Sequence, residues 1–289
     1  MKKFSTYLVS LIMSIILVFM IIATSLMTII HINVTESKSV QLFEKKHVYS
    51  LIIGELQKYF VTQYNTTGIP ADIYMEALDE DYIRTVTDGY INAVFSSLTS
   101  GKSITFDLPE NETLENNIRN FFSDYADKNN YEKNEIYEKK ISSTIENAYR
   151  VTGNYCDVYK YSTLSEHGVL SKISKIFSRF GSLMTICIVA TVFVVILLII
   201  ANIKEISCVL YWTGISAVIA GILGTVPTAW LLGVDYFDSF VIKQPQMFKA
   251  FTGAMYAFTG AVMEVHILLM CAGICLIIIY NILCKSHKK

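Results

Sequence analysis

The sequence predicts an all-α membrane protein, in which a bundle of four transmembrane helices (one plus three) carries a helical extracellular domain between spans 1 and 2. Hydrophobic residues make up 53% of the chain, and its mean hydropathy is +0.43. They gather in four blocks, each long enough for the roughly 20 apolar residues of a membrane-spanning helix. Between the first two blocks, apolar residues recur at helical spacing. Only 4 prolines and 14 glycines interrupt the chain, which favours helices over irregular structure.

The first apolar block, residues 4–30, follows Lys2 and Lys3, a basic start that is also typical of signal peptides. Its apolar run is longer than the roughly 7–15 residues of a cleaved signal, so we expect an uncleaved signal anchor. The other expected spans cover residues 181–201, 206–234 and 251–284. The predicted divisions are a signal anchor (1–30), a helical extracellular domain (31–175) and a membrane domain with spans 2–4 (176–289).

Basic residues near the helix ends predict the orientation, because cytoplasmic ends of spans carry an excess of Lys and Arg. Lys2 and Lys3 lie at one terminus, and Lys285, Lys288 and Lys289 at the other. Both termini are therefore expected in the cytoplasm of a multi-pass plasma-membrane protein. A second basic group, formed by Lys172, Lys175 and Arg179, opposes this orientation but is outweighed by the two terminal groups.

The predicted extracellular domain begins with an amphipathic helix over residues 43–60, which Gly68 and Pro70 end. A short helix follows over 70–78. Asp79 is expected to cap the next helix, which Gly101 ends. Further stripes of apolar residues predict helices over 114–125, over 137–149 with Gly153 at its end, and over 170–180. Residues 102–109 alternate in polarity and are compatible with a short strand that has no identified partner.

Continuous helices are expected at both junctions with the membrane. No strong helix breaker lies between Ile30 and Phe60, and residues 170–180 lead directly into the second span. We interpret the latter stretch as a stalk. Its basic side, formed by Lys172, Lys175 and Arg179, leaves a second interpretation, an amphipathic helix that rests on anionic lipid headgroups.

The aromatic residues and Cys156 are expected in the core of this domain. Many of the 18 tyrosines and 16 phenylalanines occur there at helical spacing, and a ligand-binding aromatic groove is the alternative interpretation. Cys156 is the domain's only cysteine, so no disulfide framework is expected.

Small residues in the third span predict close helix packing. Ser216, Ala220 and Gly224 recur every four residues, and Gly221 belongs to a neighbouring row. Small side chains let helix backbones approach each other in lipid. We therefore expect these four residues to contact other spans or a second copy of the chain.

Glu264 and His266 are the ionisable residues in the approach to the fourth span, and intramembrane ionisable groups are functional candidates. Glu264 precedes Cys284 by 20 residues, which corresponds to about 30 Å of helix. This distance predicts a pair at the outer membrane boundary, with proton or ion handling as the alternative.

Enzymatic function has no positive support in the sequence. It lacks HExxH, G-x-S-x-G, Walker A and Gly-rich dinucleotide motifs, and its five histidines are scattered. The acidic group Asp79, Glu80 and Asp81 is interpreted as a helix start. No catalytic residue, metal or cofactor is expected, and a net charge of −1 gives no reason to expect nucleic acid.

Two stretches carry a resemblance: "IPADIYMEALDEDYIRTVTDGYINAVFSSL", in which a short Pro-led helix precedes an acidic-capped one, and "YWTGISAVIAGILG" in the third span. In these and in its organisation, the chain resembles uncharacterised bacterial integral membrane proteins with one N-terminal span, a helical external domain and three C-terminal spans. This resemblance covers the whole chain and implies a bacterial host but no activity.

The layout is also similar to that of four-span permease subunits of the cell-division and macrolide-exporter type. Their cytoplasmic coupling element, which contacts an ATPase, is echoed by Glu205, Ile206 and Gly214, with Lys204 and Glu205 as the candidate coupling residues. The basic residues usual between them are missing, and the Glu-to-Gly spacing fits poorly. Residues 201–216 are therefore expected to form a turn that leads into the third span.

The sequence thus predicts a non-enzymatic plasma-membrane protein that presents a helical extracellular domain for binding or sensing. The expected partners are the lipid bilayer and a protein that contacts this domain. The alternative is a permease-like subunit that works with a separate ATPase, and a homo-oligomer is a further interpretation.

Overall fold

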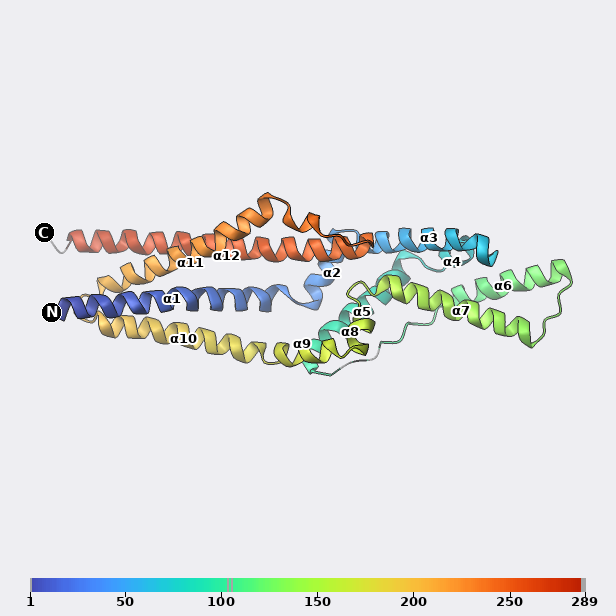
Figure 1. Ribbon diagram of the computed structural model, residues 1–289, viewed down its shortest axis with the longest axis horizontal. Helices are drawn as coiled ribbons and strands as arrows, with labels where there is room; N and C mark the ends of the chain where they lie inside the picture. The colour runs from blue at the N-terminus through green and yellow to red at the C-terminus, as the bar shows by residue number, and fades with distance from the viewer. Residues whose placement is uncertain (1, 103, 105, 287–289) are drawn as a thin grey trace. The chain divides into compact units, whose positions relative to one another are not determined.

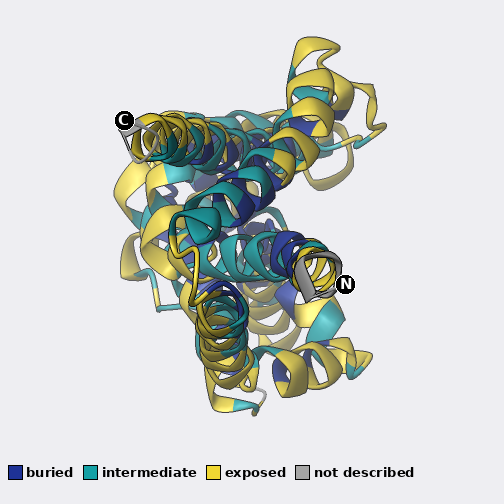
Figure 2. Ribbon diagram, turned by 90° about the vertical axis from the view of Figure 1, so that its left-hand side faces the viewer, coloured by how far each residue is buried: buried dark blue, intermediate teal, exposed yellow. Residues whose placement is uncertain are grey.

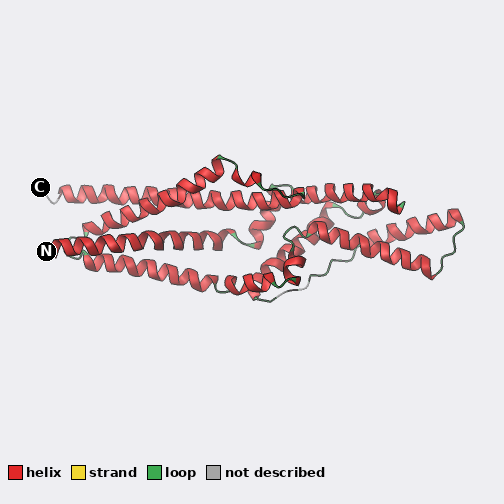
Figure 3. Ribbon diagram, in the orientation of Figure 1, coloured by secondary structure: helices red, strands yellow, loops and turns green. Residues whose placement is uncertain are grey.

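The computed structural model describes residues 2–102, 104 and 106–286. It confirms the all-α class, because these residues form helices and turns with no strand among them (Figure 3). The chain divides into two compact units. We call them the membrane unit (Met1–Thr35, Arg179–Phe240 and Ala254–Lys289) and the helical unit (Glu36–Ser178 and Val241–Gly253).

The membrane unit contains the four predicted spans. They are α1 (Lys2–Asn33), α10 (Phe180–Ala201), α11 (Ser207–Gly233) and the part of α12 (Pro245–Ser286) that follows Gly253. Each of these helices is long and apolar enough to cross a membrane. The chain is therefore a polytopic membrane protein.

Helix α1 packs against α10 and α11 (Figure 1). Leu17, Val194, Leu198 and Trp212 form the buried apolar cluster among these three helices. Many apolar residues of these helices are instead exposed, and exposed residues are yellow in Figure 2; for example, Ile186 and Val189 of α10 are 62% and 61% exposed. Such exposed apolar faces are expected where lipid tails replace water.

The helical unit contains eight complete helices among its described residues and the first turns of α12. The eight are α2 (Glu36–Lys45), α3 (Val48–Thr67), α4 (Asp72–Met75), α5 (Glu80–Ser100), α6 (Glu112–Asn129), α7 (Glu135–Cys156), α8 (Tyr161–Glu166) and α9 (Val169–Phe177). Helix α5 contacts α2, α3, α7, α8 and α9, so it is the centre of the unit. Its Ile83 and Ile91 lie in the same core as Ala250 of α12.

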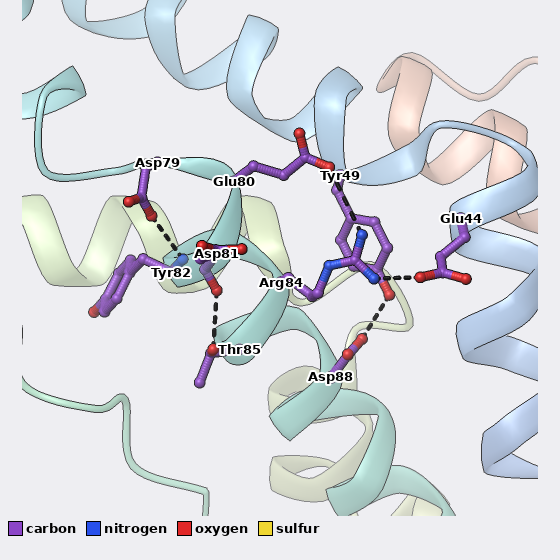
Figure 4. Close-up of polar contacts among 9 residues, drawn as sticks. All are labelled: Glu44, Tyr49, Asp79, Glu80, Asp81, Tyr82, Arg84, Thr85 and Asp88. Carbon is purple, nitrogen blue, oxygen red and sulfur yellow. Dashed lines mark hydrogen bonds and ion pairs between the residues drawn. The ribbon is translucent and has the colours of Figure 1, made fainter.

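The predicted ends of two helices are present. Gly68 and Gly101 follow α3 and α5 with φ of 70° and 73°, the left-handed conformation that glycine adopts without steric cost. At the start of α5, a side-chain oxygen of Asp79 accepts a hydrogen bond from the Tyr82 amide at 2.8 Å (Figure 4). Glu80 and Asp81 occupy the first turn, so this acidic group has the arrangement of a capped helix start.

The prediction of a continuous helix is wrong at the first junction, whereas at the second junction two residues in right-handed helical conformation, Ser178 and Arg179, connect α9 to α10. Helix α1 ends at Asn33 and α2 begins at Glu36, while α9 ends at Phe177 and α10 begins at Phe180. A further break separates α2 from α3, where His47 has a φ of 55°. A non-glycine residue in this left-handed region ends a right-handed helix as effectively as glycine does, but leaves little trace in the sequence.

Two local expectations within the helical unit are also corrected. Helix α7 continues past Gly153 to Cys156; this glycine is buried within the helix, and a Cβ there would lie 3.0 Å from Tyr90 Oη. The described residues of 102–109 form no strand, and Ser103 and Thr105 lie outside the described residues. The Ile104 amide instead donates to the side chains of Ser97 and Tyr161, which replace a strand partner.

Candidate functional site

The candidate binding site of the helical unit lies at the hairpin of α6 and α7. Two asparagines shape its connection. Asn130 ends α6 with a φ of 53°, and the side chain of Asn134 accepts hydrogen bonds from the amides of Ile136 and Tyr137 at the start of α7. Asparagine tolerates the left-handed conformation and caps helices well, so the sequence "NNYEKN" turns the chain at this point.

A cleft of about 550 Å³ lies between the two helices beside this turn. This volume is within the roughly 300–1,000 Å³ of ligand pockets. The residues that line it are Phe122, Tyr125, Ala126, Tyr131, Glu132, Asn134, Ile136, Tyr137 and Lys140. We call this set the hairpin cleft.

The hairpin cleft exposes large apolar side chains to solvent. Ile136 is 77% exposed, Tyr131 62% and Tyr125 53%. The rings of the two tyrosines stack nearly parallel, with centroids 6.0 Å apart and an interplanar angle of 12°. Burying an isoleucine side chain contributes about 1.5–3 kcal/mol, so these side chains would gain substantially from a bound apolar group.

Polar contacts next to the hairpin cleft stabilise the turn between α6 and α7. Lys133 Nζ lies 2.9 Å from Asp127 Oδ1 and donates a hydrogen bond to Ser123 Oγ at 2.8 Å, which ties the turn back to α6. Hydrogen bonding to Asp127 raises the pKa of Lys133. Glu132 and Lys140 place one charge of each sign among the lining residues. The cleft therefore offers an apolar surface with a charged rim.

The membrane unit has a second polar feature, a row of hydrogen bonds between α1 and its neighbours that we call the hydroxyl seam. Oγ of Ser10 accepts from Asn202 at 2.8 Å, and Oγ of Ser14 lies 2.8 Å from that of Ser216. Further along α1, the hydroxyls of Thr24 and Thr191 lie 2.9 Å apart, and Ser25 Oγ lies 3.3 Å from His266 Nε2. The seam thus links α1 to α10, α11 and α12.

The candidate packing residues occupy two sides of α11. Ser216 is fully buried and donates to the Ser14 carbonyl of α1, and Ala220 is fully buried as well. Gly221 and Gly224 contact α12 instead: a Cβ on Gly221 would lie 2.7 Å from the His266 carbonyl oxygen. A Cβ on Gly224 would overlap the His266 ring. Both glycines are therefore required by the close approach of the two helices.

Glu264 and His266 lie in different environments. Glu264 is exposed, whereas His266 is completely buried. The ring of His266 contacts the Val262 carbonyl through Nδ1 at 2.8 Å, so Nδ1 carries the proton in that hydrogen bond. Residues two positions apart on a helix do not face each other, and these two do not form a pair.

Lys204 and Glu205 are exposed in the short turn that connects α10 and α11. The Glu205 amide donates to the Asn202 carbonyl at 2.9 Å, and the Asn202 side chain reaches Ser10 in the hydroxyl seam. The hydrogen bonds of Asn202 thus stabilise the turn on its buried side, while the side chains of Lys204 and Glu205 are exposed to solvent.

A polar group around Arg84 joins α2, α3 and α5 (Figure 4). Arg84 forms an ion pair with Glu44, and its guanidinium lies 4.7 Å from the centre of the Tyr49 ring. Tyr49 donates to Asp88 at 2.6 Å. Burial, more than any other cause, raises the pKa values of both Tyr49 and Asp88. These paired groups link α2, α3 and α5.

Most contacts of the hairpin cleft and of the hydroxyl seam were not predicted from the sequence. An aromatic groove was one interpretation of the sequence, but its position was not predicted. The high density of tyrosines around the turn, in "YADKNNYEKNEIY", could have indicated that position. The signal for the hydroxyl seam was the hydroxyl-bearing Ser10, Ser14, Thr24 and Ser25 within an apolar run.

No protein-family model, curated protein or solved structure matches the chain.

Proposed function

We propose that the chain is a non-enzymatic plasma-membrane protein that presents its helical unit on the extracellular side and binds a partner protein through the hairpin cleft. The exposure of Ile136, Tyr131 and Tyr125 around the cleft carries this proposal. Tyrosine is enriched among the residues that dominate protein interfaces, because its large, rigid ring loses little conformational entropy on binding. Signal-anchor retention, cytoplasmic termini and a bacterial host belong to the same proposal.

The cleft favours a partner that inserts one apolar or aromatic side chain. Its walls are aromatic and aliphatic, and they supply the buried contact that usually anchors an interface. Glu132 and Lys140 at the lining would pair with charges on either side of that anchor. Charged groups at the rim add specificity and association rate more than affinity.

Site-specific photo-crosslinking in intact cells tests this binding function. A photoreactive amino acid at position 136 is expected to crosslink a defined protein, and the product should disappear when Tyr131→Ala is added. The same probe at Val61, which is 56% exposed on α3, is the matched control. Identical products at positions 61 and 136 would overturn the assignment, and a crosslink to a second copy of the chain would identify a homo-oligomer.

Cysteine labelling tests the orientation separately. Lys139 of α7 and Lys204 of the α10–α11 turn are both exposed. A membrane-impermeant maleimide added to intact cells should label Lys139→Cys and leave Lys204→Cys unlabelled until the membrane is opened. The reverse pattern would refute an extracellular helical unit while leaving the cleft itself untouched.

Retention of α1 is supported by the hydroxyl seam. Cleavage would remove the partners of Asn202, Thr191, Ser216 and His266, and unpaired polar groups in a membrane interior are costly. The intact mass of the purified protein should therefore include residues 2–33.

The alternative function, a permease-like subunit that works with a separate ATPase, is supported by the exposure of Lys204 and Glu205. A gentle detergent pull-down from the native host tests it. If an ATPase co-purifies with the parent protein and is lost from the Lys204→Ala/Glu205→Ala variant, the turn is a coupling element. Without such a loss, this alternative fails.

A further inference from the structure

Helix α9 (Val169–Phe177) has one buried side and an exposed apolar side. Leu170 and Ser174 are 3% and 1% exposed, and the helix packs against α5 and α8. On its other side, Ile173 is 42% exposed and Ile176 67%. Two isoleucines on one helical turn are an unusual surface for a helix that faces only water.

Basic residues form a second stripe beside this apolar one. Lys172, Lys175 and Arg179 recur at helical spacing and are all exposed. None of the three takes part in an ion pair within the described part of the chain. Basic side chains next to an apolar stripe are the pattern of helices that lie in a membrane interface.

Chain connectivity keeps α9 near the membrane surface. Only Ser178 and Arg179 separate Phe177 from Phe180, the first residue of α10. Three steps along an extended chain span at most about 11 Å. The 22 residues of α10 are about 33 Å long, enough to cross a hydrocarbon core of about 30 Å without α9. The end of α9 therefore lies close to the lipid headgroups.

We propose that α9 is an interfacial helix that binds the anionic headgroups of the bilayer that α10 crosses. Lys172, Lys175 and Arg179 would attract the phosphate groups, while Ile173 and Ile176 would enter the boundary between headgroups and acyl chains. This inference does not depend on the hairpin cleft or on which side of the membrane the helical unit occupies.

Hydrogen exchange of the full-length protein in lipid nanodiscs tests this proposal. One preparation contains phosphatidylcholine alone, and the other contains 30% phosphatidylglycerol. We expect slower exchange over residues 169–177 with phosphatidylglycerol, and loss of that protection in 1 M salt, which shortens the screening length to about 3 Å. Equal exchange in the two lipids would overturn the proposal, whether α9 lies in water or within the bilayer core.

Substitutions of the basic residues and of the isoleucines of α9 test the electrostatic and the apolar contribution to lipid binding separately. Each basic residue near an anionic surface contributes about fivefold in binding, so Lys172→Gln/Lys175→Gln/Arg179→Gln should lower the lipid-dependent protection at least about tenfold. Lys102→Gln/Lys128→Gln/Lys139→Gln removes the same charge from exposed positions elsewhere and should keep it. Ile173→Ser/Ile176→Ser should weaken protection yet leave its salt dependence. A larger loss in the control triple variant than in the α9 variant would refute the proposed site.

Discussion

The imidazole ring of His266 occupies the space that a Cβ on Gly224 would fill. Helices α11 and α12 approach so closely here that His266 Cδ2 and Cγ are the nearest side-chain atoms to the glycine. A fully buried polar side chain in the membrane unit thus depends on the absence of a methyl group on the neighbouring helix.

Gly224→Ala is expected to destabilise the membrane unit. Overpacking a tight contact costs about 1–3 kcal/mol, because the ring or the helix must move. Resistance to unfolding by SDS in mixed micelles measures this change. Gly260→Ala on α12 is the matched control, since no atom lies within 4 Å of a Cβ there. Equal stability of the two variants would contradict the packing described.

The contact between Ser25 and His266 should give a measurable coupling energy. In a double-mutant cycle with Ser25→Ala and His266→Ala, we expect about 0.6 kcal/mol, the typical value for interhelical hydrogen bonds in a membrane. Glu264→Gln should show no coupling to Ser25, because Glu264 is exposed. A stronger coupling of Ser25 to Glu264 than to His266 would instead support the ion-handling interpretation of that region.

Asp88 should make the helical unit more stable as the pH falls. Burial raises the pKa of Asp88 in the folded state, so the folded protein binds this proton more tightly than the unfolded chain does. The ionised carboxylate therefore opposes folding at neutral pH. Its cost is relieved as the pH falls through the raised pKa and is gone below the ordinary carboxyl pKa.

Asp88→Asn, which imitates the neutral form, should accordingly slow hydrogen exchange of α3 and α5 relative to the parent at pH 7.5 and match it at low pH. Comparing both proteins at the same pH cancels the intrinsic exchange rates. Asp124→Asn, at an exposed position on α6, should have no such effect. Faster exchange in Asp88→Asn at pH 7.5 would show that the ionised carboxylate stabilises the fold.

Cys156 should resist alkylation while the helical unit is folded. Burial raises the pKa of its thiol to about 12, so little of the reactive thiolate is present at pH 8. Mass spectrometry after maleimide treatment should find this residue unmodified, whereas Lys139→Cys reacts readily. Labelling of Cys156 should appear only in denaturant. Rapid modification of the native protein would contradict the burial of this side chain.

The parts of the fold that were predictable depend on local signals. Length and apolarity identify the spans, and the left-handed glycines Gly68 and Gly101 end their helices as expected. The break at His47 escaped prediction, because neither glycine nor proline marks it. The hairpin cleft and the hydroxyl seam depend on which helices lie side by side. Periodicity shows which face of a helix is apolar but not which neighbour covers it.

Helix α12 has a consequence for the order in which the protein is made. The segment Val241–Gly253 belongs to the helical unit, and Ala250 is buried in its core, yet a ribosome reaches this segment long after α2 to α9 have emerged. The helical unit therefore remains incomplete until α12 has been made. A chain truncated before Pro245 would lack the side chains that α12 adds to this core, Ala250 and Met247. The helical unit thus completes its core only after the third span, α11, has been made.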